Sequence, residues 1–180
     1  LPLSPVLLLA VFALTPSVFL PGPASASEAA RGSAWERSVV TIEVTRKQYD
    51  YIQPWSARTA SVQKNGTVFG PTEILTTAEF LADHTLIRLQ KGGRGKWYQG
   101  KVAWVDYHAN LALITSSEPG FWGELKPVRL ADSTPNKGEM ALVRWREGRF
   151  ETRKADITRI DIKKGKLSYV EHLAMEVDCE

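Results

Sequence analysis

Ser38-Val-Val-Thr-Ile-Glu-Val-Thr45 is the stretch of sequence that decides the fold. In an extended chain, Val40, Ile42 and Val44 fall on one face, and the residues between them fall on the other. A repeat of two residues is typical of a strand with one buried face. The stretch therefore predicts a strand that sends every second side chain into a core.

Similar short segments, rich in Val, Ile, Thr and aromatic residues, follow along the chain. Asn65-Gly66 between two of them suits a tight turn that needs positive φ, and Lys91-Gly-Gly-Arg-Gly95 suits a hairpin loop. No long window has the period of a helix, and one short helical turn is expected at 77–83. Strands are predicted at 60–63, 73–76, 85–89, 97–104, 111–115, 127–130, 140–144, 150–160, 167–170 and 174–177. Short strands separated by turns predict an all-β fold, a barrel or a sandwich.

Composition narrows the classes of function. The chain has 180 residues, 43% of them hydrophobic, which is enough for one ordinary core. The net charge is only +3 and the two signs are interleaved, so no nucleic-acid partner is expected. The single cysteine, Cys179, excludes an internal disulfide and is expected to pack as a small core residue. Because His84, His108 and His172 are scattered, no metal or cofactor is expected.

The start of the chain differs from the rest. Residues 6–20 are almost wholly apolar, and Ala24-Ser25-Ala26 offers the small-residue pattern that signal peptidase accepts. Pro16 and Pro21 interrupt the apolar stretch, which disfavours a membrane-spanning helix. Residues 1–26 are therefore predicted to be a secretory signal peptide, truncated at its front because it has neither Met nor a preceding Lys or Arg. The product is expected to be exported, either periplasmic or extracellular.

Four stretches in order resemble the HtrA/Deg family of trypsin-like serine proteases, especially its plant-type Deg members. The first two are Ile74-Leu-Thr-Thr-Ala-Glu-Phe-Leu-Ala-Asp-His-Thr85 and Val102-Ala-Trp-Val-Asp-Tyr-His-Ala-Asn-Leu-Ala-Leu-Ile114. Phe121-Trp-Gly-Glu-Leu-Lys-Pro-Val-Arg-Leu-Ala-Asp132 is similar to the segment that joins the two barrels of the family. Leu173-Ala-Met-Glu-Val-Asp-Cys-Glu180 is similar to the strand that leads to its nucleophile loop.

The resemblance implies a domain organisation. A linker is expected at 27–37 and a trypsin-like six-stranded β-barrel at 38–118. An inter-barrel connection at 119–137 leads to an incomplete second β-barrel at 138–180. In the family such domains commonly precede PDZ domains and assemble as trimers, so a homo-oligomer is implied as well.

The resemblance also implies where a catalytic triad would stand. Acyl transfer needs a serine, an imidazole that takes its proton, and a carboxylate that orients the imidazole. Here Glu79 stands at the family His position, Asn110 stands at the Asp position, and the serine would lie beyond Glu180. A glutamate with a pKa near ~4.3 is a poor base toward a hydroxyl at neutral pH. Asn in place of the orienting Asp costs about 10⁴ in kcat, so no catalytic residue is expected to be intact.

Other residues leave alternatives open. His84 or His108 could in principle replace the missing imidazole, although an exposed structural histidine is the simpler interpretation of each. Asp83 and Asp106 are interpreted as turn residues. The segment 65–67 fits the N-glycosylation acceptor pattern, but Asn-Gly is also simply a good turn.

The leading hypothesis is a degenerate serine protease-like domain that binds polypeptide or unfolded protein segments by strand addition. The rival is an active serine endopeptidase of exported-protein quality control whose serine lies beyond residue 180. A scaffolding domain without peptide affinity is a third possibility. The aromatic residues Trp35, Tyr49, Tyr51 and Trp55 could form an exposed binding patch, but the expected role is packing over the open end of the barrel.

The signal peptide gives the first testable prediction. N-terminal sequencing of the mature protein should begin at Ser27 or a near neighbour, because cleavage follows Ala24-Ser25-Ala26. Recovery of the uncleaved chain from the cytosol would contradict export.

Overall fold

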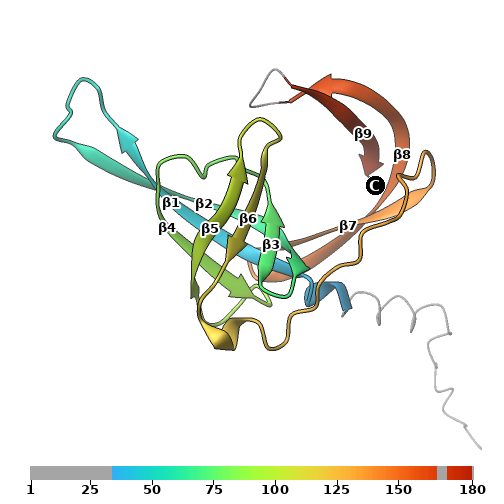
Figure 1. Cartoon of the computed structure of the whole chain (residues 1–180), viewed down its shortest axis with the longest axis horizontal. Coiled ribbons are helices and arrows are strands. Elements are labelled where there is room, and N and C mark those ends of the chain that lie inside the picture. Colours follow the sequence, from blue (N-terminus) through green and yellow to red (C-terminus); the bar gives the residue numbers. More distant parts are fainter. Residues whose placement is uncertain (1–33, 166–169, 180) are drawn as a thin grey trace, which may run out of the picture.

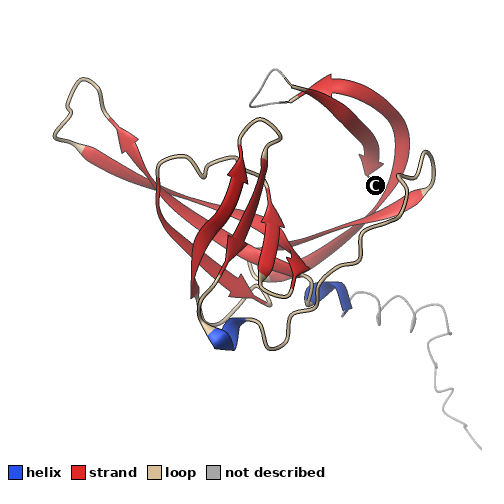
Figure 2. Cartoon of the chain, viewed as in Figure 1, coloured by secondary structure: helices blue, strands red, loops and turns tan. Residues whose placement is uncertain are grey.

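The computed structural model describes residues 34–165 and 170–179, and strands make up most of its regular structure (Figures 1 and 2). The predicted signal peptide and most of the strand predicted at 167–170 lie outside the described residues. The strands are β1 (Val39–Tyr49), β2 (Ala57–Gly70), β3 (Glu73–Thr76), β4 (His84–Lys91), β5 (Tyr98–Asp106), β6 (Leu111–Thr115), β7 (Glu139–Arg146), β8 (Arg149–Lys164) and β9 (Glu171–Cys179). A 3₁₀ helix, η1, covers Pro119–Phe121. No helix among the described residues is both long enough and apolar enough to span a membrane.

Six of the strands close into an antiparallel barrel in the order β1-β2-β3-β6-β5-β4, and β7, β8 and β9 form a separate three-stranded sheet. Strand β1 closes the barrel because it is hydrogen-bonded to β2 on one side and to β4 on the other. The predicted all-β class and the six-stranded first barrel are confirmed, and a partial second sheet follows the barrel.

The barrel core follows the alternation seen in β1. Val40, Ile42 and Val44 are fully buried, as the period of two predicts. Phe121 of η1 is also buried in this core. Its ring packs edge-on against that of Tyr98, with ring centroids 5.2 Å apart. The connection after the barrel therefore contributes a core residue as well as a link.

The predicted turn at Asn65-Gly66 is wrong. Both residues lie inside β2, where Asn65 pairs with Thr41 and Gly66 pairs with Val40. A Cβ on Gly66 would lie 2.5 Å from Cγ2 of Ile74, so this glycine allows close packing in the core. Asn-Gly suits a tight turn, but it also suits a crowded strand. Here the close packing of Gly66 against the core favours the strand.

Three smaller expectations also fail. Residues 77–83 form turns without a helical segment, because Phe80 and Asp83 have positive φ values of 66° and 57°. No strand forms at 127–130, where Pro127 has no N–H to donate to a ladder. Cys179 is exposed at the end of β9 instead of buried in a core.

The hairpin loop predicted at 91–95 is confirmed. Gly92, Gly93 and Gly95 have φ values of 66°, 61° and 84°, a region that favours glycine. Gly93 also lets a distant side chain approach, because a Cβ there would lie 2.3 Å from the ring of Trp145. The loop thus serves as a contact surface for the second sheet.

Trp145 of β7 joins the second sheet to the barrel. Its backbone N–H donates to Oδ1 of Asn65 at 2.8 Å, and its carbonyl accepts from Nδ2 of Asn65 at 3.1 Å. Its indole Nε1 donates to the carbonyl of Val39 at 2.8 Å. Because Trp145 lies against the outer face of β1, Val39 and Thr41 on that face are buried too.

We predict that Asn65→Ala lowers the free energy of unfolding by about 1–3 kcal/mol, because it leaves the polar backbone of Trp145 without its partner in a half-buried place. Urea unfolding of the variant measures this change. Asn136→Ala, at an exposed residue of the inter-barrel connection, is the matched control. Equal stability of the two variants would show that Asn65 does not join the units.

Candidate functional site

The two triad positions inferred from the resemblance lie next to each other. Pairing of Thr76 in β3 with Ala112 in β6 brings the loop after β3 against the turn before β6. Oδ1 of Asn110 accepts a hydrogen bond from the backbone N–H of Glu79 at 3.0 Å. The backbone carbonyl of Asn110 accepts one from Ala78 at 3.2 Å. The Asn110 amide is therefore used to hold the backbone of the loop.

Asn110 has a φ of 55°, in the left-handed region that Asn adopts more readily than most residues. This conformation belongs to the tight turn between β5 and β6. Asp106 supports the same turn, since its Oδ1 accepts from the backbone N–H groups of His108 and Ala109 at 2.8 and 3.1 Å. The interpretation of Asp106 as a turn residue is thereby confirmed.

Lys64 of β2 holds the Glu79 loop from another side. Its Nζ donates to the carbonyl oxygens of Thr77 and Glu79 at 2.6 and 2.9 Å. Burial lowers the pKa of Lys64 from 10.5 to about 8, and the Glu79 carboxylate opposes this shift in part. The loop that bears the family His position is thus fixed by an amide and by a half-buried ammonium group.

A cavity of about 320 Å³ lies beside Glu79. The guanidinium carbon of Arg46 stands 4.9 Å from the centre of the Phe80 ring, a cation–π distance. The charges around the cavity are mixed, so it has no clear preference for one sign of ligand. The lining residues are Arg46, Lys47, Ala78, Glu79, Phe80, Ala82, Asp83 and Tyr107.

The histidines weighed as replacements are both exposed. His84 is the first residue of β4, and its Nδ1 lies 2.7 Å from the carbonyl oxygen of Leu81. His108 lies in the turn that precedes Asn110. These placements fit the structural interpretation of the two histidines.

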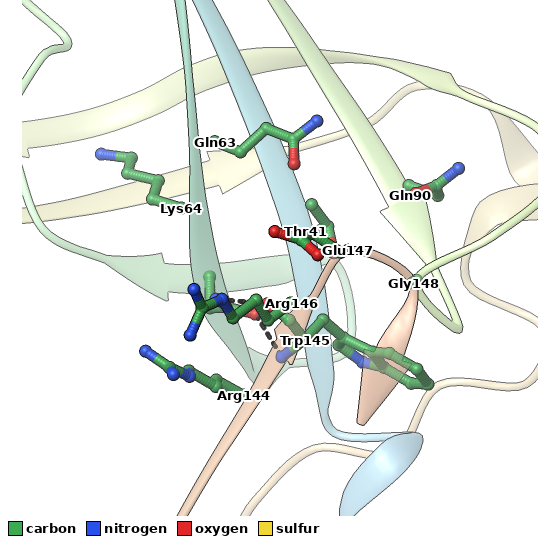
Figure 3. Close-up of a pocket in the computed structure, with 11 residues that line it drawn as sticks. Thr41, Gln63, Lys64, Gln90, Arg144, Trp145, Arg146, Glu147 and Gly148 are labelled. Atoms are coloured by element: carbon green, nitrogen blue, oxygen red, sulfur yellow. Dashed lines mark hydrogen bonds between the residues drawn. The ribbon is translucent and has the colours of Figure 1, made fainter. Parts of the chain in front are cut away.

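A larger cavity of about 480 Å³ lies between the barrel and the turn from β7 to β8 (Figure 3). Lys64, Gln63 and Gln90 contribute polar groups from the barrel. Arg144, Trp145 and Arg146 contribute from β7 (Figure 3), and Asn65, which is hydrogen-bonded to Trp145, also lines the cavity. Sequence reasoning missed Lys64, which lines this cavity, and Arg46, which lines the smaller one, because strand pairing places them and they belong to no motif. It also gave no role to Tyr107, although this residue lies within the stretch 102–114.

The pKa of Lys64 gives a prediction for stability against pH. The unfolded chain binds more protons than the folded chain between about pH 8 and pH 10.5, so the contribution of Lys64 to stability rises with pH across this window. The stability of the wild-type chain relative to Lys64→Met should therefore increase from pH 8 to pH 10. Denaturant unfolding at both pH values measures it, with Lys101→Met on exposed β5 as control. Parallel pH profiles for wild type and Lys64→Met would contradict the lowered pKa.

Relatives and solved structures point to one family. No family model matches the sequence. The chain is 26% identical over 144 residues to the Arabidopsis thaliana protein named "Putative protease Do-like 3, mitochondrial", a match that covers 78% of this chain and 26% of the relative. It is 27% identical over 93 residues to "Putative protease Do-like 6, chloroplastic" of the same plant, covering 52% and 42%. The chain thus spans less than half the length of these relatives.

Solved structures share the fold. The active form of the Rv3671c protease from M. tuberculosis superposes with a TM-score of 0.65 at 19% identity, covering 96% of this chain and 73% of that one. An HtrA-type protease solved with a decapeptide gives a TM-score of 0.65 at 12% identity, covering 79% and 48%. The Do-like relatives and this shared fold show that the chain is similar to Deg/HtrA proteases and has their trypsin-like fold.

Proposed function

We propose that this chain is a catalytically impaired Deg/HtrA-type domain that binds extended polypeptide segments without cutting them. One observation carries the proposal: the Asn110 side chain accepts a hydrogen bond from the backbone of Glu79, at 3.0 Å. In a working triad, the groups at these two positions are an orienting carboxylate and an imidazole. Here an amide binds main chain, and a carboxylate replaces the proton acceptor.

The surroundings of Glu79 support a structural use of its loop. Lys64 donates to the carbonyl oxygen of Glu79, so both polar groups of this residue's backbone are engaged. A loop whose backbone is fixed in this way suits a wall of a binding site better than a reaction centre.

Peptide binding needs no triad, because an extended segment bonds through its main chain and places side chains in nearby recesses. The cavity beside Glu79 is one such recess. Tyr107 at its edge is 44% exposed and offers an aromatic surface to an entering side chain. The HtrA-type protease solved with a decapeptide supports polypeptide as the class of ligand.

The alternative is an active serine endopeptidase acting on exported proteins, with its serine beyond residue 180. Lys64 is the observation in its favour, since a base works best with a pKa near the working pH and the pKa of Lys64 is about 8. Its Nζ, however, already donates to two carbonyl oxygens. This occupation favours the binding function.

The proposal also includes export from the cytosol and assembly as a homo-oligomer, a trimer by analogy with the family. The names of the plant relatives place those proteins in mitochondria or chloroplasts, which supports an N-terminal targeting segment as the general class. Light scattering on the purified chain measures the oligomeric state.

We predict that the chain binds fluorescein-labelled unfolded casein in an anisotropy titration and leaves it intact over hours by mass spectrometry. Tyr107→Ala should weaken binding on the order of fivefold, the loss of one aromatic contact worth about 1 kcal/mol. Glu79→Gln should leave binding nearly unchanged, because the neutral side chain has the same shape.

Arg129→Ala is the matched control, because Arg129 is an exposed residue of the inter-barrel connection outside the cavity lining. Two results would overturn the proposal. Casein cleavage abolished by Glu79→Gln or Lys64→Met would reveal catalysis at this site. Absence of casein binding would leave the scaffolding interpretation.

A further inference from the structure

The hairpin between β1 and β2 extends well beyond the barrel. Strand β1 pairs with β4 only as far as Arg46, opposite His84, and β2 pairs with β3 from Thr67 onward. Residues 47–59 therefore form a two-stranded arm without a third strand beside it, which projects from the barrel at the upper left of Figure 1. We call this segment the arm, and residues 49–56 its tip.

The tip exposes large apolar side chains. Tyr49, Tyr51, Ile52 and Trp55 are 60%, 93%, 88% and 83% exposed, so the expectation that the aromatic residues Tyr49, Tyr51 and Trp55 pack over the barrel is wrong. Exposed apolar residues gathered in one place mark an interaction surface more often than isolated ones do. The gathering of these residues at the end of a projecting arm therefore indicates a surface that contacts another molecule.

The conformation of the tip is fixed by its own hydrogen bonds. Oδ1 of Asp50 accepts from the backbone N–H groups of Ile52 and Gln53 at 3.0 and 3.2 Å. The backbone N–H of Ser56 donates to the carbonyl of Gln53 at 2.8 Å. The one acidic group of the tip is thus turned toward the main chain, and the apolar side chains face outward.

Two cations stand behind the tip. Lys47 and Arg58 are both exposed. Arg58 lies opposite Gln48 in the ladder, so its side chain is on the other face of the arm from Lys47. Lys47 is two residues from Tyr49, or about 7 Å along the strand. The arm therefore carries aromatic residues at its end and a positive charge on each face just behind them.

We propose that the tip of the arm inserts into the interfacial layer of an anionic phospholipid membrane. Trp and Tyr prefer this layer because their rings are apolar and their N–H and O–H groups are polar. Lys and Arg at the headgroup level are attracted to anionic lipids. A projecting arm presents its tip end-on, a shape that a fluid bilayer accommodates without a preformed recess. The mixed apolar and basic character therefore favours lipid over a second protein surface.

A fluorophore on the tip tests the proposal within the full chain. The single cysteine is removed by Cys179→Ser, and Gln53→Cys, at an exposed tip residue, carries the environment-sensitive dye NBD. Vesicles of phosphatidylcholine with phosphatidylserine should shift its emission to the blue and intensify it. Vesicles of phosphatidylcholine alone should do so much less. The dye reports on the tip itself, so binding through any other segment does not imitate this result.

Variants of the arm identify the groups responsible. Ile52→Ser and Trp55→Ser should each weaken vesicle binding about tenfold, because each removes a large apolar side chain from the lipid. Lys47→Gln and Arg58→Gln should each weaken it about fivefold on anionic vesicles. All four residues are exposed, so circular dichroism should show an unchanged fold.

The matched control is Leu130→Ser, at another exposed apolar residue (60%) outside the arm, with NBD on Ser133→Cys as the control label. Leu130→Ser should leave vesicle binding unchanged. The emission of NBD at residue 133 should not change when vesicles are added. Vesicle binding without an emission change at residue 53, or an equal change on neutral vesicles, would overturn the proposal. Self-association in solution that Trp55→Ser abolishes, without vesicle binding, would instead identify a second copy of the chain as the partner.

Discussion

The double pairing of β1 is the constraint on which the rest of the structure depends. This strand is hydrogen-bonded to β2 along one edge and to β4 along the other, and without it the other five strands would form an open sheet. Closure removes the exposed edges and leaves one enclosed core for the alternate side chains. Val40, Ile42 and Val44 are completely buried because the barrel closes around them.

Closure also determines the position of the candidate site. Within the ring, β3 lies beside β6, so the loop that bears Glu79 meets the turn that bears Asn110 although 31 residues separate them. These are the two positions at which the resemblance to the proteases implies a histidine and an aspartate. The Asn110 side chain holds the backbone of the Glu79 loop, which is a stabilising use of this position.

The all-β class could be predicted from the sequence because its main determinant is local, whereas the six-stranded barrel was implied by the resemblance. The period of two in β1 and the glycines of the loop at 91–95 depend on neighbouring residues, and the structure confirms both. The use of Asn65 could not be foreseen in this way, since its partner Trp145 lies 80 residues away and Asn-Gly is ordinarily a turn signal. Local rules fail where a distant contact decides the outcome.

The same distinction applies to the site. Glu79 and Asn110 could be located because a family motif marks their positions, and their contact follows from the expected barrel. Lys64 belongs to no motif; only strand pairing shows that its Nζ reaches the Glu79 loop, and only burial shows that its pKa falls to about 8. The exposure of Tyr51 and Trp55 was likewise hidden, because composition cannot distinguish a buried aromatic residue from one on a projecting arm.

The number of strands that pair with β1 changes along its length. Up to Arg46 it has a strand on each side, the N–H of Lys47 still donates to the carbonyl of Asp83 at 3.4 Å, and Gln48 and Tyr49 pair with β2 alone. Local opening of a segment costs the contacts that hold it, so amide protons should be retained longest near Ile42 and lost soonest near Tyr49. Local opening at the far end of the strand therefore leaves the barrel intact. Insertions, deletions and substitutions at that end should leave the stability of the core unchanged.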